Sequence, residues 1–350
     1  MIRQAMASAM LNRGGLPLFG AFLVWGAGSG AQTLGRPLLA FEFTGSVFLV
    51  TLMISALALS RIVGGPLTGF LVDRIGRRPL AALGSSIRTA ASVGDVFARN
   101  YIQFFALEMI GAIGLTMFNT TSMVIIADMS DSSNRGKAVA LRSSALKLGQ
   151  VAGPLLAGIV AYFFGLRYVF LINAVAKLIV TFIVLRHIAE TKPEPEIPER
   201  TSECRTASLK DSRVILPILL TPGFAALTIS TFGIHLMTQG VFQALFPIQS
   251  KVQAGLSDGD VGTLISIASV VTLIFALPNG IILDRFGRKR SLVSGLFMLS
   301  GAALLLAISR DYNGALAVAV LYGLAQSMTT GSSQTYAMDL APPLTIEALS

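Results

Sequence analysis

The sequence predicts an all-α fold, a polytopic membrane bundle of helices arranged as two pseudo-symmetric halves. Of its 350 residues, 53% are hydrophobic and only 13% are charged, whereas a soluble domain carries about 25% charged residues. Apolar runs of about 20 residues, long enough to cross a bilayer as a helix, recur along the chain. A charged motif between two such runs, "GFLVDRIGRRPL" from Gly69, returns as "GIILDRFGRKRSL" from Gly280. Together these observations predict a duplicated membrane protein.

Ten apolar segments are predicted to form membrane spans. They are rich in Gly and Ala, which lets helices pack closely inside a bilayer. Arg88 and Asp95 dilute the third segment, and Pro217 and Pro222 interrupt the start of the seventh. The segments cover approximately residues 16–35, 45–71, 79–98, 101–127, 137–164, 167–188, 214–246, 259–283, 290–309 and 313–338.

Lysine and arginine are distributed unevenly between the two sides of the predicted bundle. An even number of spans puts both termini on one side, together with both charged motifs, while a few residues such as Arg36 and Arg310 fall in the opposite loops. Loops rich in Lys and Arg face the cytoplasm, so we expect both termini there and the protein in the plasma (inner) membrane. The net charge of +9 does not gather on one basic face, which argues against a nucleic-acid partner.

A polar connection at residues 189–213 separates six spans from four. Its content of Pro, Glu and Ser predicts a flexible cytoplasmic linker. We therefore expect an N-terminal six-helix bundle at residues 1–188 and an incomplete four-helix C-terminal bundle at residues 214–350.

An internal repeat supports this division. Asp73 and Asp284 are 211 residues apart, and so are Asp128 and Asp339, which lie at the cytoplasmic ends of two spans. Two landmarks in one register indicate a parallel duplication.

The two charged motifs fit tight turns between antiparallel membrane helices. Their glycines permit unusual backbone angles, the Asp can face a helix N-terminus, and the arginines stay near anionic lipid head groups. Basic residues that served only as topology anchors would need neither the Asp, nor fixed glycines, nor a second copy. The pattern is carried by Gly69, Asp73, Arg74, Gly76, Arg77 and Arg78, and again by Gly280, Asp284, Arg285, Gly287, Arg288 and Lys289.

This pattern resembles the signature loop of the major facilitator superfamily, which follows the second and the eighth span. Motif, duplication and central loop agree with that family over essentially the whole chain. The resemblance implies that both turns are conformational-switch loops, which latch the halves together and release them as a transporter alternates between inward-open and outward-open states. The family has twelve spans, so the ten predicted here imply a chain truncated at its C-terminus.

A second resemblance lies in the fifth span. The stretch "GQVAGPLLAG", with Gly149, Gly153, Pro154 and Gly158, is similar to a motif of antiporters, chiefly drug and metabolite exporters. Physically, it predicts a thin, kinked helix that packs tightly on a neighbour. Generic small-residue packing produces a similar spacing, so the resemblance favours export over uptake without deciding between them.

Ionisable and amide side chains within the spans are the candidates for a proton and substrate site. A charge at the bilayer centre costs about 2.5–3.5 kcal/mol on insertion scales, which makes such residues functional candidates. Glu108 could carry a proton in a low-dielectric cavity, or it could simply be hydrated near the outer interface. The full set of candidates is Glu108, Arg61, Arg88, Asn119, His235, Gln239, Gln243 and Gln326.

We therefore expect a secondary active transporter that moves a small organic solute by alternating access, with proton-coupled efflux as the first interpretation. Its partners would be the small-molecule substrate, the proton as coupling ion and the lipid bilayer. The alternatives are uptake of a sugar or an organic acid, and a sensor or scaffold that transports nothing. The sequence has no HExxH, Gly-x-Ser-x-Gly or P-loop motif, so no enzyme activity is expected. One cysteine and two histidines predict neither a metal site nor a cofactor.

Overall fold

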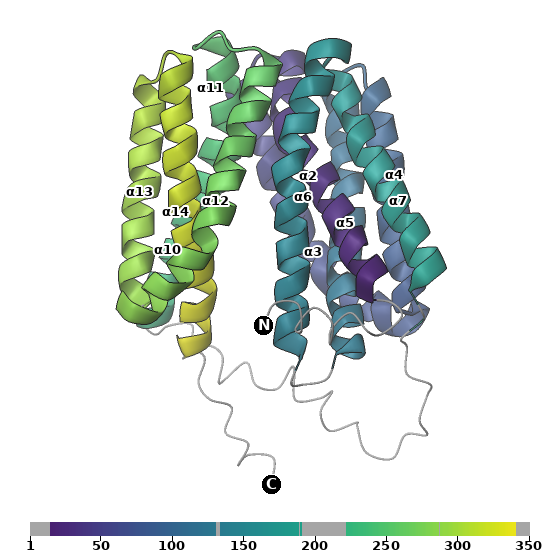
Figure 1. Cartoon of the computed structure of the whole chain (residues 1–350). Helices are drawn as coiled ribbons and strands as arrows, with labels where there is room; N and C mark the ends of the chain where they lie inside the picture. Colours follow the sequence, from purple (N-terminus) through teal and green to yellow (C-terminus); the bar gives the residue numbers. More distant parts are fainter. Residues whose placement is uncertain (1–14, 131–133, 189, 191–221, 287, 341–350) are drawn as a thin grey trace.

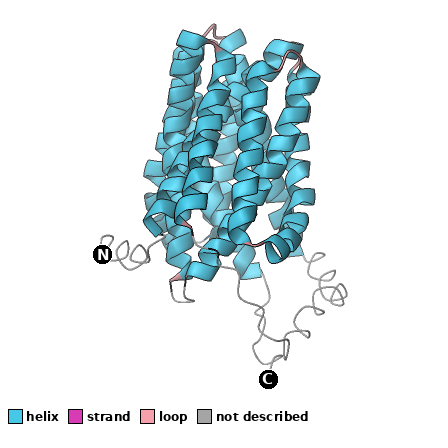
Figure 2. Ribbon diagram, turned by 90° about the vertical axis from the view of Figure 1, so that its right-hand side faces the viewer, coloured by secondary structure: helices cyan, strands magenta, loops and turns pink. Residues whose placement is uncertain are grey.

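The computed structural model describes residues 15–130, 134–188, 190, 222–286 and 288–340. Long helices stand side by side as nearly parallel rods joined by short turns (Figures 1 and 2). The described residues contain no strand, and the predicted all-α class is confirmed. We call the end of the bundle where α2 begins and α14 ends the lower end, as in Figure 1, and the opposite end the upper end.

Among the described residues, six long helices precede the central connection. They run alternately up and down, and a short 3-10 turn, η1 (Leu166–Tyr168), leads into the last of them. The six are α2 (Gly15–Thr44), α3 (Val47–Ile75), α4 (Arg77–Phe97), α5 (Tyr101–Met129), α6 (Arg135–Phe164) and α7 (Val169–His187).

Four rods follow the connection. The first of them is made of α10 (Pro222–His235), the π-helix η2 (Leu236–Leu245) and α11 (Phe246–Val252), which follow one another without a break. Such wide turns are rare inside helices and often mark functional sites. The remaining rods are α12 (Asp258–Phe286), α13 (Arg288–Ile308) and α14 (Tyr312–Leu340).

Each of the ten predicted spans corresponds to a described rod, and the largest difference is in the first span. We expected that span to end at residue 35, but α2 continues through Arg36 and Pro37 to Thr44. The prediction that Arg36 lies in an outer loop was wrong. Its guanidinium pairs with the carboxylate of Glu108 inside the bundle. The linker predicted at 189–213 lies outside the described residues except for Glu190, and the division into residues 1–188 and 214–350 stays a prediction.

The outward faces of the rods suit a bilayer. Phe48, Ile102 and Phe297 are each more than 70% exposed, which would be costly in water and is favourable against lipid tails. By length and composition, six segments of the described helices are able to cross a membrane: Val47–Val72, Tyr101–Met129, Gly136–Phe164, Leu166–His187, Asp258–Ala276 and Arg290–Ile308.

Glycines bring α2 and α6 into backbone contact. A Cβ added to Gly149 would lie 2.0 Å from the carbonyl oxygen of Leu23, and one added to Gly153 would lie 2.3 Å from that of Ala27. Gly26 of α2 faces α6 in the same way. Small residues at this spacing let two membrane helices approach closely, so Gly149 and Gly153 pack α6 against α2.

Gly158 has a different role, because it faces the other group of helices. A Cβ on Gly158 would lie 3.2 Å from backbone atoms of Asp258 and Gly259 at the start of α12. From the other side, a Cβ on Gly262 would lie 2.6 Å from the carbonyl oxygen of Pro154. Helices α6 and α12 therefore meet, backbone against backbone, toward the upper end of the bundle (Figure 1).

Replacing Gly153 by Leu tests the contact between α2 and α6. The added side chain has to displace the backbone of α2, and overpacking of this kind costs about 1–3 kcal/mol or more. We expect a lower melting temperature and a smaller monodisperse fraction in detergent. Gly136→Leu is the matched control, because Gly136 begins the same helix with no atom within 4 Å of an added Cβ; equal losses in both variants would contradict the contact.

Candidate functional site

The first charged turn, Gly69–Arg78, links α3 to α4. Gly76 stands between the two helices with φ +104°, a region that side-chain-bearing residues rarely adopt. The carboxylate of Glu190 accepts hydrogen bonds from the backbone N–H groups of Arg77 (2.8 Å) and Arg78 (3.1 Å). We expected an Asp to face the positive N-terminal end of a helix. At the start of α4 the described carboxylate is that of Glu190, and the side chain of Asp73 lies outside what the structure describes.

The arginines of this turn hold neighbouring helices. Arg77 Nε is 3.1 Å from the Asp128 carboxylate on α5, and Arg78 donates to the carbonyl of Leu185 on α7. Arg74 is exposed and lies over the ring of Phe70. Partly exposed ion pairs are worth about 0–1 kcal/mol each, so these contacts are weak enough to be broken and remade.

The second charged turn lies where the repeat predicts it, because α12 ends at Phe286 and α13 begins at Arg288. The side chains of Asp284, Arg285, Arg288 and Lys289 are outside what the structure describes, as are the surroundings of Gly280 and the whole of Gly287.

A cavity of about 800 Å³ lies between the two groups of helices. Most of its wall comes from the first six helices, and Gln239 and Gln243 of η2 complete it. It adjoins a smaller space of about 330 Å³ between α6, η2, α12 and α14. We call the first the central cavity and the second the aromatic pocket; Thr33, Gln150 and Gln243 line both.

A buried ionic cluster closes the upper part of the central cavity. Glu108 is fully buried, and its carboxylate contacts Arg36 Nε at 2.8 Å and Arg88 Nη2 at 3.0 Å. Gln32 Nε2 donates to the same carboxylate at 3.3 Å. Glu108 is therefore not a hydrated residue at an interface, and one carboxylate joins α2, α4 and α5.

Asp95 is a second buried carboxyl beside this cluster. Its side chain is inaccessible to solvent, and neither oxygen has a hydrogen-bond partner among the described residues. The charges of Glu108, Arg88 and Arg36 act on this carboxyl. The sequence showed Asp95 only as a polar interruption of the third span.

A buried amine positions the single tryptophan. Lys177 is 1% exposed, and its ammonium donates to the Trp25 carbonyl at 2.7 Å and to Ser29 Oγ at 2.8 Å. The same ammonium lies 3.7 Å from the centre of the Trp25 ring. The ring of Phe118 stacks on Trp25, with 3.8 Å between the two ring centres. Trp25 is thereby held at the edge of the central cavity.

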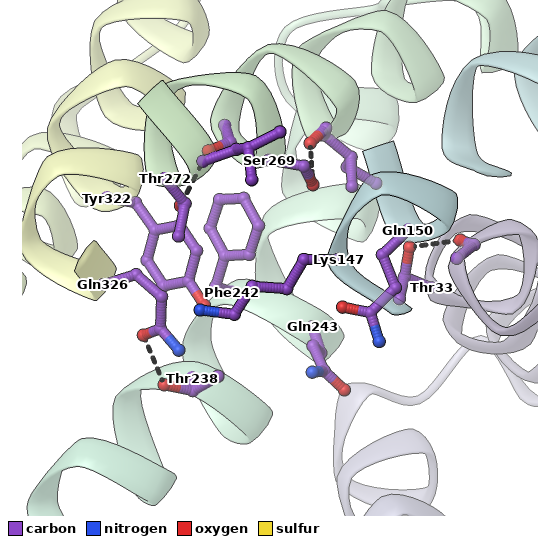
Figure 3. Close-up of a pocket in the computed structure, with 14 residues that line it drawn as sticks. Thr33, Lys147, Gln150, Thr238, Phe242, Gln243, Ser269, Thr272, Tyr322 and Gln326 are labelled. Atoms are coloured by element: carbon purple, nitrogen blue, oxygen red, sulfur yellow. Dashed lines mark hydrogen bonds between the residues drawn. The ribbon is translucent and has the colours of Figure 1, made fainter. Parts of the chain in front are cut away.

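Two basic residues of α6 line the lower and middle parts of the cavities. Arg142 donates to Asn119 Oδ1 and to Ser122 Oγ, both at 3.2 Å. Lys147 lines the aromatic pocket, where Figure 3 shows it extending toward Phe242 and Tyr322. From the sequence, Arg142 and Lys147 were predicted only as cytoplasmic charges. The structure shows that both line the internal spaces.

The other candidates divide clearly. Arg88, Asn119, Gln239 and Gln243 line the central cavity, and Gln326 lines the aromatic pocket with Thr238, whose hydroxyl donates to it at 3.2 Å. His235 is exposed, and its one hydrogen bond within the described part of the chain is to Thr231 O of its own helix; it is not among the residues that line either space. The side chain of Arg61 lies outside what the structure describes.

The described residues contain no group of three or more His, Cys, Asp or Glu side chains that could hold a metal ion.

Lipid-suited outer faces around a polar internal cavity define an integral membrane protein built around a ligand-sized space. A model of the Major Facilitator Superfamily matches residues 18–346, and the chain belongs to this family, whose members are transporters and not enzymes. The family resemblance inferred from the charged turns is confirmed.

Several curated relatives are named multidrug resistance proteins. The chain is 24% identical over 257 residues to Multidrug resistance protein 2 of Bacillus subtilis (strain 168), covering 72% of this chain and 62% of that protein. It is 30% identical over 267 residues to Multidrug resistance protein MdtG of Dickeya zeae (strain Ech586), covering 73% and 60%. The chain thus spans about three fifths of the length of these relatives.

Solved structures share the fold at low identity. A bacterial homolog of the human lysosomal transporter Spinster, described as inward-facing and unoccupied, superposes with a TM-score of 0.76 at 16% identity, over 94% of this chain and 75% of that one. A D-xylose-proton symporter gives a TM-score of 0.67 at 18% identity, over 93% and 85%. These likenesses support the architecture and leave the substrate open.

Glu108→Gln tests the ionic cluster. The substitution leaves the buried Arg88 and the partly buried Arg36 without their carboxylate, and breaking a buried pair on one side costs about 3–5 kcal/mol. We expect unfolding at a clearly lower SDS fraction in mixed micelles. Glu42→Gln is the control, since Glu42 is exposed on α2; equal midpoints for the two variants would contradict the cluster.

Proposed function

We propose that the chain is a secondary transporter that exports a small organic solute in exchange for protons. The observation that carries the proposal is the cavity of about 800 Å³ between the two groups of helices, which residues of both groups line. A site at the meeting of two helical bundles is open to alternate sides when the bundles rock against each other.

The contact through Gly158 and Gly262 supports a rocking movement. It joins α6 to α12 by backbone atoms near the upper end, where small residues make a thin and separable interface. We propose that this contact opens when the lower ends of the two groups of helices close. We also propose that the protein lies in a bacterial inner membrane with its lower end facing the cytoplasm, because basic residues predominate at that end.

The charged turns are proposed as switch loops of this movement. In the first turn, Arg77 and Arg78 are held by Asp128, Leu185 and Glu190 through partly exposed contacts. Interactions of this strength can exchange partners at little cost. The second turn, from Gly280 to Lys289, is proposed to act in the same way for the other helices.

We propose that Asp95, rather than Glu108, carries the coupling proton. Glu108 is occupied by Arg36 and Arg88, whereas Asp95 is equally buried and has no hydrogen-bond donor among the described residues. An intramembrane carboxyl with no counter-charge of its own is a functional candidate for carrying a proton.

Export is favoured over uptake by the names of the relatives and by α6. Two relatives are named for multidrug resistance, and Gly149, Gly153, Pro154 and Gly158 match a motif associated with antiporters. A driven-flux experiment separates the directions. Purified chain in liposomes is given a pH gradient of either sign, and uptake of a panel of radiolabelled organic anions, neutral compounds and cations is measured.

Export by exchange predicts that an acid interior drives accumulation of at least one compound, because leaving protons are exchanged for entering solute. Accumulation driven only by an acid exterior would instead establish proton symport. Flux equal to that of empty liposomes under both gradients would contradict the transport proposal.

Asp95→Asn tests the proton-binding group. The amide keeps the shape of the side chain and cannot exchange a proton, so we expect gradient-driven accumulation to fall to the level without a gradient, while exchange of labelled for unlabelled solute persists. Asp311→Asn is the matched control at an exposed position beside Gly314. Undiminished gradient-driven accumulation by Asp95→Asn would show that the proton binds elsewhere.

A further inference from the structure

The charge of the cavity wall is one-sided. Four cationic side chains line the central cavity and the aromatic pocket: Arg36, Arg88 and Arg142 line the first, and Lys147 lines the second. No Asp or Glu is among the described residues that line either space. The polar remainder of the two walls is neutral: it consists of Ser, Thr, Asn and Gln residues together with Trp25 and Tyr322.

Buried carboxylates compensate only part of this charge. Glu108 lies behind the wall and is shared by Arg36 and Arg88. Asp95 lies farther along α4, and within the described residues it forms no ion pair or hydrogen bond with a cation of the wall. Even with both carboxyls ionised, the four cations outnumber the anions around the two spaces.

Arg142 has only neutral partners among the described residues. Its Nη2 donates to Asn119 and Ser122, and its guanidinium lies 5.1 Å from the centre of the Phe22 ring. Its Nε is buried and has no hydrogen-bond partner within the described part of the chain. The full positive charge of Arg142 is therefore left to act on the contents of the central cavity.

Lys147 is less satisfied still. It is partly buried, and within the described residues no hydrogen bond or ion pair is formed by its ammonium. Figure 3 shows the side chain reaching across the aromatic pocket toward Phe242 and Tyr322, whose rings stack at 3.5 Å with an interplanar angle of 3°. An ammonium and an aromatic pair thus line the same space.

An uncompensated cation in a water-poor space is costly, and a charge-assisted hydrogen bond to a carboxylate removes much of that cost. The same field repels a cationic ligand. We propose that the two connected spaces bind an amphipathic organic anion, with its carboxylate or similar acid group on Lys147 and its apolar body against the Phe242–Tyr322 stack. This inference rests on the proposed transport function and names its substrate class.

Arg142, Arg36 and Arg88 extend the positive potential from the lower end of the central cavity to its upper part. Gln150 and Gln243 line both spaces, and a ligand that passes them from Lys147 enters a cavity lined by these three arginines. Neutral amide and hydroxyl groups along this route can bond the ligand without fixing its identity.

Binding to the purified full chain in nanodiscs tests the proposal without requiring transport. The probes are 4-tert-butylbenzoate, its neutral amide and 4-tert-butylbenzylammonium, which share one body and differ in charge. Trp25 is the only tryptophan of the chain and lines the central cavity, so its fluorescence reports occupancy, and isothermal calorimetry provides a second readout. We expect the carboxylate to bind at least about tenfold more tightly than the other two probes, a factor of about 1.4 kcal/mol.

Lys147→Met removes the ammonium at nearly constant length and should weaken carboxylate binding about tenfold without affecting the amide. Lys147→Arg should retain the preference for the anion, which guards against a variant that merely misfolds. Lys137→Met is the matched control, because Lys137 is exposed in the first turn of the same helix and donates to Asn134.

Preferred binding of the ammonium probe, equal binding of all three probes, or no binding of any of them would overturn the anion proposal. So would unchanged carboxylate affinity in Lys147→Met. None of these results affects the gradient-driven flux that tests transport, so failure of the substrate class and failure of the transport proposal are distinguishable.

Discussion

The central constraint on this bundle is that charges inside a low-dielectric interior must be compensated. The carboxylate of Glu108 forms ion pairs with two guanidinium groups, those of Arg36 and Arg88. It thereby connects α5 to α2 and α4. Replacing such a pair by apolar groups often costs nothing, whereas breaking it is expensive. A cluster of this kind is therefore a better indication of specificity and function than of stability. Here it fixes where the central cavity ends and leaves the wall below it positive.

Helix α6 connects this constraint to movement. One part of it, through Gly149 and Gly153, lies against the backbone of α2, and another part, through Gly158, lies against α12. The same helix carries Arg142 and Lys147 toward the two spaces. A shift of α6 relative to α12 would therefore change both the contact between the two groups of helices and the position of the cations. Ligand binding and rocking share one structural element.

The helices could be predicted from sequence because apolar length is a strong signal, and the charged turn at Gly76 because its pattern requires a special backbone angle. The sequence predicted a loop at Arg36 because an Arg-Pro pair follows an apolar run there. Only the ion pair with the distant Glu108 shows that Arg36 lies inside the bundle. Arg142 and Lys147 were taken as cytoplasmic anchors, since counting positive charges ignores which face of a helix they occupy. Helical periodicity, with Arg142 and Gln150 eight residues apart on one face, was the signal that could have found them.

The central claim is that the negative charge of Glu108 compensates the positive charges of Arg36 and Arg88. A double-mutant cycle between Glu108 and Arg88 tests this claim most directly. The free energy of unfolding is measured in mixed micelles for the unmodified chain, Glu108→Gln, Arg88→Gln and the double variant. The account predicts that the second substitution restores part of the stability lost by the first, with a coupling energy of about 1–3 kcal/mol. Losses that simply add, with no coupling beyond the error of measurement, would contradict it.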